Sequence, residues 1–309
     1  MIHYLYLGRV DYGEALRLQQ ELVALRTAAR IGNVLLLLEH PPVLTLGRNA
    51  KRANILASDE ILAQRGVTLH EINRGGDVTY HGPGQLIGYP IFDLRSLRNP
   101  NDACPPGRGN RLGPVDFVRL MEETLIRLCG EFGVAAGRIC GLTGVWCGLP
   151  SSLAEGSPMC DSPQLSSKTP APAGRERKIA AIGIHVARGV TSHGFAFNVT
   201  TDLRDFTLIN PCGITDRPVT SLEREIADRK DLPSLESLAP MAARQFGLVF
   251  DEPVAHIESL AALRALAEAA PDSPVAEFPA PEFPAQDTSL QIPPEIERLR
   301  HAKDRPISA

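Results

Sequence analysis

The sequence predicts an α+β protein built in α/β layers, with a mixed β-sheet core and flanking helices. Two observations predict this class. Some stretches carry apolar residues at steps of three and four, as amphipathic helices do, and others are short apolar runs bounded by glycine or proline, as strands are. Strands interspersed with a few helices indicate a layered structure. With 309 residues, 43% of them hydrophobic, the chain can bury a sizeable core.

The first elements alternate between helix and strand. Residues 12–30 predict a helix packed on the sheet, because Ala15, Leu18, Leu22, Leu25 and Ala29 fall on one face. Residues 34–38 and 43–46 are apolar runs separated by two prolines, which predicts two short buried strands that meet at a corner. Residues 77–80 and 85–92 predict two further strands around the turn Gly82-Pro83-Gly84.

A second helix is expected to follow Asp116, whose side chain suits an N-cap. The residues expected on its inward face are Val118, Met121, Leu125, Leu128 and Phe132. After it, residues 148–177 hold five prolines and six serines without periodicity, and residues 271–309 hold eight of the 26 prolines. We therefore expect one folded domain over 1–250, a mobile Pro/Ser-rich insertion at 148–177, and a largely disordered Pro-rich extension over 251–309, with one short helix starting at Pro294.

Composition narrows the function classes. The formal net charge of -4 and the pI near 6.1 leave no basic excess, so nucleic acid is not an expected partner. No apolar span is long enough for a membrane helix and no secretory leader is evident, which predicts a cytoplasmic protein without a membrane partner. The six cysteines, without CxxC pairs, predict free thiols rather than zinc ligands, and no histidine spacing indicates a metal site.

The segment from Arg74 to Gln85 predicts a ligand-binding wall. Four glycines are interleaved there with Arg74, Tyr80 and His81, and an apolar strand follows. Glycine lets a ligand approach backbone N–H groups, while the three side chains can orient polar atoms. The plainer interpretation is a hairpin with a Gly-Pro-Gly turn, since turns use the same residues.

Cys212 and Lys178 are the candidate catalytic pair. Cys212 stands between Pro211 and Gly213, which suits an accessible sulfur, but an ordinary thiol is only a few per cent thiolate at neutral pH and needs a base or cation nearby. Alternation along Lys178, Ala180, Ile182, Ile184 and Val186 places the lysine on the apolar side of a strand, where burial favours a neutral amine. A solvated lysine and a buried, inert cysteine are the plainer alternatives.

Histidine is the competing base, because Cys–His pairs are common in thiol catalysis. His81, His185 and His193 are all eligible. Alternation turns His185 away from the lysine, whereas His81 is expected to line the pocket as an orienting group, and His40 to do likewise.

Three further segments resemble, together with residues 74–85, one enzyme family. Lys178–His185, His193–Asn198 and Asn210–Ile214 are similar in residues, order and spacing to the octanoyltransferases of lipoate biosynthesis, which have a biotin/lipoate ligase-like fold. The resemblance covers roughly residues 1–250. It implies that Cys212 carries an octanoyl thioester and that Lys178 activates it. The implied donor is octanoyl-acyl carrier protein, and the implied acceptors are apo lipoyl domains of 2-oxoacid dehydrogenases and the glycine-cleavage H protein, with no cofactor.

The substrate-binding residues expected on this basis form three groups. They are Arg74, Gly75, Gly76, Asp77, Val78, Thr79, Tyr80 and His81; then Ala181, Ile182 and Gly183; then Gly194, Phe195 and Ala196. Small residues in the last two groups are expected to leave space for an alkyl chain, whose burial is worth about 0.8 kcal/mol per methylene. Backbone N–H groups at Gly75-Gly76 or Gly194 are candidates for an oxyanion hole.

Three other functions remain open on the sequence alone. An ATP-dependent lipoate-protein ligase of the same fold would have no use for a nucleophilic cysteine. A Cys–Lys thioester hydrolase would release the free acid. A noncatalytic acyl-binding module would need neither Lys178 nor Cys212.

Overall fold

The computed structural model describes residues 1–100, 111–149, 176–210, 217–228, 230 and 232–270. Within these residues the strands form an eight-stranded and a three-stranded sheet. The large sheet contains, in spatial order, β11 (Val254–His256), β1 (Ile2–Arg9), β2 (Asn33–Glu39), β6 (Gln85–Ile91), β10 (Val190–Asn198), β9 (Arg177–Ala187), β8 (Leu142–Cys147) and β7 (Ala136–Ile139). The small sheet has the order β4 (Thr68–Glu71), β3 (Val43–Leu46), β5 (Val78–His81).

The helices belong to the folded unit that spans residues 1–272. They are α1 (Tyr12–Thr27), α2 (Asp59–Gln64), α3 (Pro114–Gly130), α5 (Leu222–Glu225), α6 (Leu235–Phe250) and α7 (Leu260–Ala269), with short 3-10 turns η1 (Arg52–Asn54), η2 (Leu94–Ser96) and η4 (Leu203–Leu208). No helix in the described part of the chain has both the length and the apolar character needed to cross a membrane.

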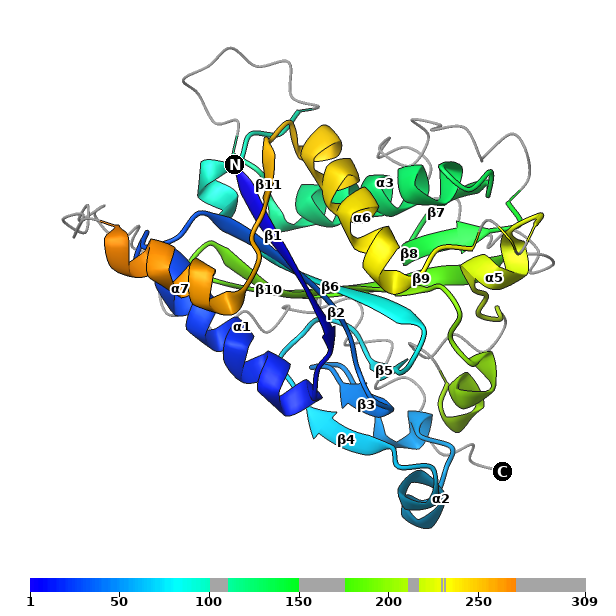
Figure 1. Ribbon diagram of the computed structural model, residues 1–309. Helices are drawn as coiled ribbons and strands as arrows, with labels where there is room; N and C mark the ends of the chain where they lie inside the picture. The colour runs from blue at the N-terminus through cyan, green and yellow to red at the C-terminus, as the bar shows by residue number, and fades with distance from the viewer. Residues whose placement is uncertain (101–110, 150–175, 211–216, 229, 231, 271–309) are drawn as a thin grey trace, which may run out of the picture. The chain divides into compact units, whose positions relative to one another are not determined.

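The large sheet is mixed, as the sequence predicts. β1 runs parallel to both β2 and β11, whereas the other neighbouring strands pair antiparallel. Helices α3 and α6 pack on one face of the sheet and α1 and α7 on the other (Figure 1). Both faces of β2 are therefore buried, which explains why residues 34–38 read as an unbroken apolar run.

The elements expected in the first hundred residues are confirmed, with small shifts at their ends. Helix α1 begins after Asp11, whose carboxylate accepts hydrogen bonds from the N–H groups of Gly13 and Glu14. Helix α3, in contrast, begins two residues before the predicted N-cap. Gly113 is the N-cap and Pro114 occupies the first turn, where its missing N–H costs nothing. Met121, Leu125 and Leu128 are buried as expected, while Val118 and Phe132 are only partly buried.

The folded unit extends beyond the boundary predicted at residue 250. β11 pairs in parallel with β1, and Leu263 and Ala267 of α7 are buried beside α1. Apart from Pro253, the prolines of the C-terminal region all follow these elements, so composition over 251–309 concealed a strand and a helix. The expected helix at Pro294, and residues 150–175 of the expected insertion, lie outside the described residues.

A bulge in β9 reverses the face on which Lys178 lies. Trp146 pairs with Lys178 but Val145 pairs with Ala180, so Ile179 is the extra residue. Ile179 and Ala180 are both in the apolar core, and Lys178 instead shares a cavity with Ala181. The prediction that Lys178 lies on the same face as Ala180, Ile182, Ile184 and Val186 is therefore wrong, because strict alternation fails across a bulge.

Candidate functional site

An enclosed cavity lies where β5, β6, β9 and β10 converge. We call it the lysine cavity. Its lining residues are Thr79, Gln85, Lys178, Ala181, Ala196, Asn198, Phe206 and Val219. Polar and apolar side chains both line the cavity, so it holds an ionisable amine in surroundings from which water is largely excluded.

Lys178 is 7% exposed and reaches this cavity from a fixed piece of backbone. Its N–H donates to the carbonyl of Pro218 at 2.9 Å, and its carbonyl accepts from the N–H of Thr220 at 2.8 Å. Residues 218–220 follow directly on the segment that contains Cys212. On the other side of that segment, the N–H of Asn210 donates to the carbonyl of Asn54 at 2.8 Å. Both flanks of the cysteine segment are thus anchored by backbone hydrogen bonds.

A chain of side-chain hydrogen bonds leads away from Thr220. The amide nitrogen of Asn198 donates to the Thr220 carbonyl at 2.9 Å, so its oxygen is free to accept from Gln85 Nε2 at 2.8 Å. Gln85 Oε1 then faces His81 Nδ1 at 2.9 Å. The Thr220 carbonyl can only accept, which fixes the orientation of the Asn198 amide, and the Asn198 oxygen in turn fixes that of Gln85. Because Gln85 then presents its oxygen to His81, the ring must carry its proton on Nδ1.

The chain continues from His81 to Arg74. His81 Nε2 faces the hydroxyl of Thr45 at 3.4 Å, and that hydroxyl oxygen accepts from Arg74 Nε at 3.2 Å. Arg74 Nη2 also donates to the Thr45 carbonyl at 2.7 Å, and Arg74 is only 7% exposed. The buried guanidinium therefore has an orientation set by β3.

Burial keeps the interior histidines neutral. Burial first, and then the proximity of His40, lowers the pKa of His81 to about 3. Burial likewise lowers the pKa of His40 to about 4, and that of His193 to about 4 with a further contribution from Arg74. His40 donates from Nδ1 to the Val10 carbonyl and accepts from the Tyr89 hydroxyl, each at 2.7 Å. These rings orient neighbours but are poor proton acceptors at neutral pH.

The other eligible histidines lie on different parts of the site. His193 adopts a positive φ of 55° and its Nε2 lies 2.8 Å from the Asn73 side-chain oxygen, next to the Arg74 loop. Burial, and then Arg48, lowers the pKa of His185. Neither lines the lysine cavity.

The residues from Arg74 to His81 divide between two environments. Thr79 lines the lysine cavity and His81 bonds to Gln85, while Val78 and Tyr80 point into an apolar cluster with Phe206 and Leu208. The Tyr80 hydroxyl donates to Asp205 at 2.7 Å, and burial is the main cause that raises its pKa.

The loop at the start of this segment is held by its own carboxylate and backbone. Asp77 accepts from the N–H groups of Lys51 and Val78 and from the Asn54 side chain. The N–H of Gly75 donates to the Ile184 carbonyl at 2.9 Å, and Gly76 has a φ of 89°. Gly75 thus uses its N–H within the fold, which leaves it unavailable as an oxyanion donor in this conformation.

The expected substrate-binding residues of β9 and β10 lie on opposite faces of the sheet. Ala181 and Ala196 line the lysine cavity, but Ile182 and Phe195 face the apolar core beneath α3 and α6. Phe195 stacks on Phe246 with ring centroids 5.8 Å apart, so its side chain lies away from the cavity.

The two glycines expected to leave space for substrate instead allow close packing. A Cβ at Gly183 would lie 2.8 Å from the carbonyl oxygen of Gly75, and a Cβ at Gly194 would lie 2.0 Å from that of Gly88. Both positions are filled by neighbouring backbone, so glycine is required there for the approach of chain segments.

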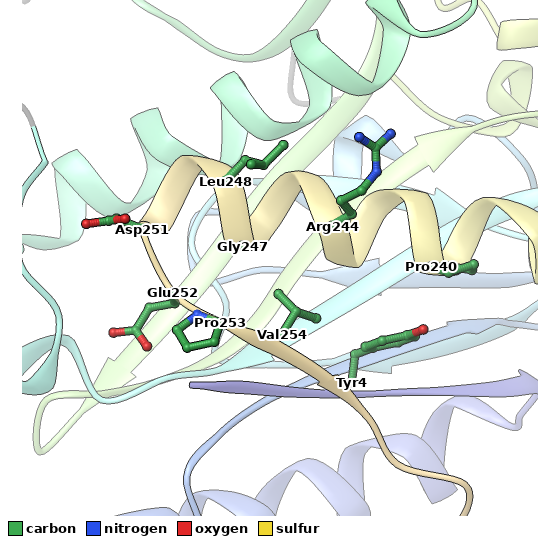
Figure 2. Close-up of a pocket in the computed structure, with 9 residues that line it drawn as sticks. All are labelled: Tyr4, Pro240, Arg244, Gly247, Leu248, Asp251, Glu252, Pro253 and Val254. Carbon is green, nitrogen blue, oxygen red and sulfur yellow. The ribbon is translucent and has the colours of Figure 1, made fainter.

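The lysine cavity is small in this conformation. Its volume is ≈ 10 Å³, which suits about one water molecule and not an alkyl chain. A larger pocket of ≈ 580 Å³ lies elsewhere, between α6 and the strands β1 and β11 (Figure 2). Tyr4, Arg244 and Leu248 are among its lining residues, and no residue of the sequence motifs reaches it.

Two of the described cysteines are buried thiols. Burial raises the pKa of Cys147 to about 12 and that of Cys129 well above its ordinary value. Cys140 is disulfide-bonded, so the prediction of free thiols fails at that residue. Cys212 lies outside the described residues. Among the described residues, no group of three or more His, Cys, Asp or Glu side chains is arranged to hold a metal ion.

The sequence reasoning missed several residues of the cavity. Gln85 and Asn198 terminate two of the motifs that carried the family resemblance, yet neither was assigned a role. Phe206 and Val219 lie just outside the motifs, and nothing in their local sequence distinguishes them from core residues. Trp146, whose ring lies against Lys178, was not among the expected site residues.

The fold is that of the lipoate-protein ligases. The structure resembles a chain from the structural analysis of a bi-partite lipoate protein ligase and its E2 lipoyl domain from Thermoplasma acidophilum. The TM-score is 0.54, over 86% of this chain and 89% of that chain. At 14% sequence identity this likeness establishes the fold. It confirms the predicted mixed-sheet, ligase-like architecture.

Sequence comparison narrows the class. The lipoyl protein ligase A/B catalytic domain profile matches residues 11–246, and the chain belongs to this family. It is 56% identical to an octanoyltransferase of Acidobacterium capsulatum, over 84% of this chain and 94% of that protein. It is 52% identical to an octanoyltransferase of Koribacter versatilis, over 84% and 88% of the two chains. The protein is therefore an enzyme, and its class is acyltransferase.

Proposed function

We propose that the protein transfers an octanoyl group from octanoyl-acyl carrier protein, through a thioester on Cys212, to the lysine of an apo lipoyl domain. The proposed acceptors are the lipoyl domains of 2-oxoacid dehydrogenases and the glycine-cleavage H protein. The similarity to octanoyltransferases supports the acyl group, and the buried Lys178, joined by backbone hydrogen bonds to residues 218 and 220, is the observation that carries the mechanism.

In the first step the Cys212 thiolate attacks the thioester carbonyl of the donor. A new C–S bond forms, the bond to the phosphopantetheine sulfur breaks, and the leaving thiolate takes a proton from the Lys178 ammonium. The low-dielectric cavity strengthens the attraction between ammonium and thiolate, so the pair favours the reactive form of the cysteine. Gln85 and Asn198 line the cavity together with Lys178.

In the second step the substrate lysine attacks the acyl-enzyme as a free amine. The amide C–N bond forms, the bond to Cys212 sulfur breaks, and the proton lost by the amine is taken up by the Lys178 amine. A thioester is converted to an amide, which is downhill without ATP. The cavity must widen for an eight-carbon chain, since its present volume suits a single water molecule.

Mass spectrometry after mixing with octanoyl-acyl carrier protein, without ATP, tests this proposal. We expect one octanoyl adduct, located on Cys212 by peptide mapping, and its loss when an apo lipoyl domain is added. Cys212→Ala should form no adduct. Normal modification of the lipoyl domain by Cys212→Ala refutes the proposal, an absolute need for ATP indicates a ligase, and free octanoate without an acceptor indicates a hydrolase.

A further inference from the structure

Trp146 makes a direct contact with the side chain of Lys178. Lys178 Nζ lies 4.7 Å from the centroid of the indole ring. The two residues are partners across β8 and β9, next to the bulge at Ile179, so the contact is built into the strand register. Trp146 is fully buried and is the single tryptophan of the chain.

The stem of Lys178 is confined on a second side by Gly144. A Cβ at Gly144 would lie 3.3 Å from Lys178 Cε and 2.6 Å from the Ala180 carbonyl oxygen, and Gly144 has a φ of 121°. The buried carboxylate of Glu122 accepts from the Gly144 N–H at 2.9 Å, which fixes this backbone in place. The lysine stem therefore runs between a glycine backbone and an indole.

Glu122 is itself fixed by two guanidinium groups. It accepts from Arg119 Nη1 at 2.8 Å and from Arg138 Nε at 3.2 Å. The side wall of the lysine stem thus rests on an ion-paired carboxylate with no exposed surface. Such a support fixes β8 beside the lysine and leaves the indole little freedom to move away.

The indole at this position costs the fold free energy. Its Nε1 is buried and has no hydrogen-bond partner among the described residues. An unsatisfied buried donor costs free energy that a phenyl ring would avoid. The compensating gain is the electron-rich face of the indole, the strongest cation-binding face among the aromatic side chains, and it is turned toward the lysine amine.

We propose that Trp146 is a positioning residue for acyl transfer, which holds the Lys178 amine in the lysine cavity and favours its ammonium form. This inference rests on the proposed function, because it assigns Lys178 the role of proton donor to the leaving thiol. It favours a thiolate–ammonium pair as the resting state of Cys212 and Lys178 over a thiol with a neutral amine.

The effect of Trp146 on the pH profile has a definite sign. When the thiol–ammonium form loses its first proton to give thiolate–ammonium, the cation is present before and after, so the indole does not change that step. The second deprotonation removes the cation that the indole stabilises. A weaker π face therefore moves the basic limb of kcat/KM to lower pH and leaves the acid limb in place.

Fluorinated tryptophans test this with little change in ring size. Because the chain has one tryptophan, replacement during expression alters Trp146 alone. In the full-length enzyme we expect the basic limb to move to lower pH with each added fluorine, by about one pH unit in total. A basic limb at the same pH for every folded fluorinated protein overturns the inference.

Substitutions provide a second measurement. Trp146→Phe should show a small shift of the basic limb and Trp146→Leu a larger one, with thermal unfolding recorded for each. The tryptophan fluorescence of the native enzyme should titrate with the lysine amine, and this transition should be absent in Lys178→Met. A transition that persists in Lys178→Met contradicts the contact.

The controls separate this inference from the proposed function. If Cys212→Ala and Lys178→Met retain octanoyl transfer, the proposed function fails and Trp146 has no pair to position. If both are inactive while fluorination leaves the basic limb unchanged, the proposed function stands and the role of Trp146 is refuted.

Discussion

The two faces of the large sheet near β9 and β10 are buried to a similar degree but filled with opposite chemistry. On the α3 and α6 side, Phe92 meets Phe117, Phe246 and Phe250 edge-on, with centroids 5.7 to 6.1 Å apart. We call these four rings the aromatic core. On the other side, the lysine cavity is bordered by Lys178, Gln85 and Asn198, each at most 7% exposed.

Under the proposed function, this difference separates the residues that stabilise the fold from those that carry out acyl transfer. Apolar burial in the aromatic core contributes about 25 cal/mol per Å² without any directional requirement. Buried polar groups cost free energy unless every partner is supplied, and the chain from Thr220 to Arg74 supplies them in a fixed order. We infer that the lysine cavity serves acyl transfer and lowers the stability of the fold.

Replacing the buried lysine is the strongest way to test this division. Lys178→Met should lower kcat/KM for octanoyl transfer on the order of 10²- to 10⁴-fold, because the cysteine loses its proton partner. The melting temperature should stay the same or rise, since an apolar chain replaces a buried amine. The exposed Lys230→Met serves as the matched control, and a Lys178→Met enzyme within threefold of the native rate would break the comparison.

The converse effect is expected in the aromatic core. Phe246→Ala should lower the free energy of unfolding by about 3–5 kcal/mol, because it removes a fully buried ring and leaves a cavity. Urea unfolding measures this. Activity per folded molecule should change little.

The control for Phe246→Ala is on the same helix. Leu248 is 59% exposed, so Leu248→Ala should stay within about 0.5 kcal/mol of the native protein. Equal losses for the two variants would contradict the assignment of the aromatic core as the main source of stability.

A hydrogen-bonding residue between the two regions should affect both properties moderately. Asn198→Leu leaves Gln85 Nε2 and the Thr220 carbonyl without their partner, which should cost about 1–3 kcal/mol in unfolding free energy. We also expect kcat to fall by about tenfold, because residues 218–220 border the cysteine segment. Urea unfolding and steady-state kinetics on one preparation check both. If Asn198→Leu keeps both native kinetics and native stability, Asn198 is not part of the site.

The smallest expected effect per residue is on pH stability. His40, His81 and His193 have pKa values lowered to about 4, 3 and 4, so their neutral forms stabilise the fold. That stabilisation is complete above the unfolded value near 6.5 and is lost as pH falls toward the folded values. Between pH 7 and 5, unfolding free energy should drop by about 1–2 kcal/mol per histidine.

Urea titrations of the native protein and of His40→Gln at the two pH values measure this loss. The variant should lose less stability on acidification than the native protein. The exposed His256→Gln is the control and should follow the native curve. A native protein equally stable at pH 7 and 5 would show that the interior histidines are not held neutral by burial.

The aromatic core was more predictable from the sequence than the lysine cavity. The strands and helices that build the aromatic core follow from apolar periodicity, and residues 12–27, 33–39 and 85–91 form elements close to the predicted ranges. Periodicity carries no information on bulges, so the orientation of Lys178 was predicted wrongly. The N-cap of α3 was misplaced because Asp116 suited the role as well as Gly113.

The lysine cavity was predictable only in part. Family resemblance selected Lys178, Thr79, Ala181 and Ala196, which the structure brings together. It also selected Ile182 and Phe195, whose side chains the sheet turns to the opposite face. The links among Gln85, Asn198 and Thr220 depend on strand register between distant segments, and no local pattern specifies that register.

The pH dependence of Cys212 alkylation by iodoacetamide tests the central claim most directly, with all other cysteines monitored by peptide mapping. We predict that the native enzyme reacts with a midpoint well below the ordinary thiol value near 8.5, and that Lys178→Met returns the midpoint toward that value. Identical midpoints in the two proteins would show that the buried lysine does not activate the cysteine.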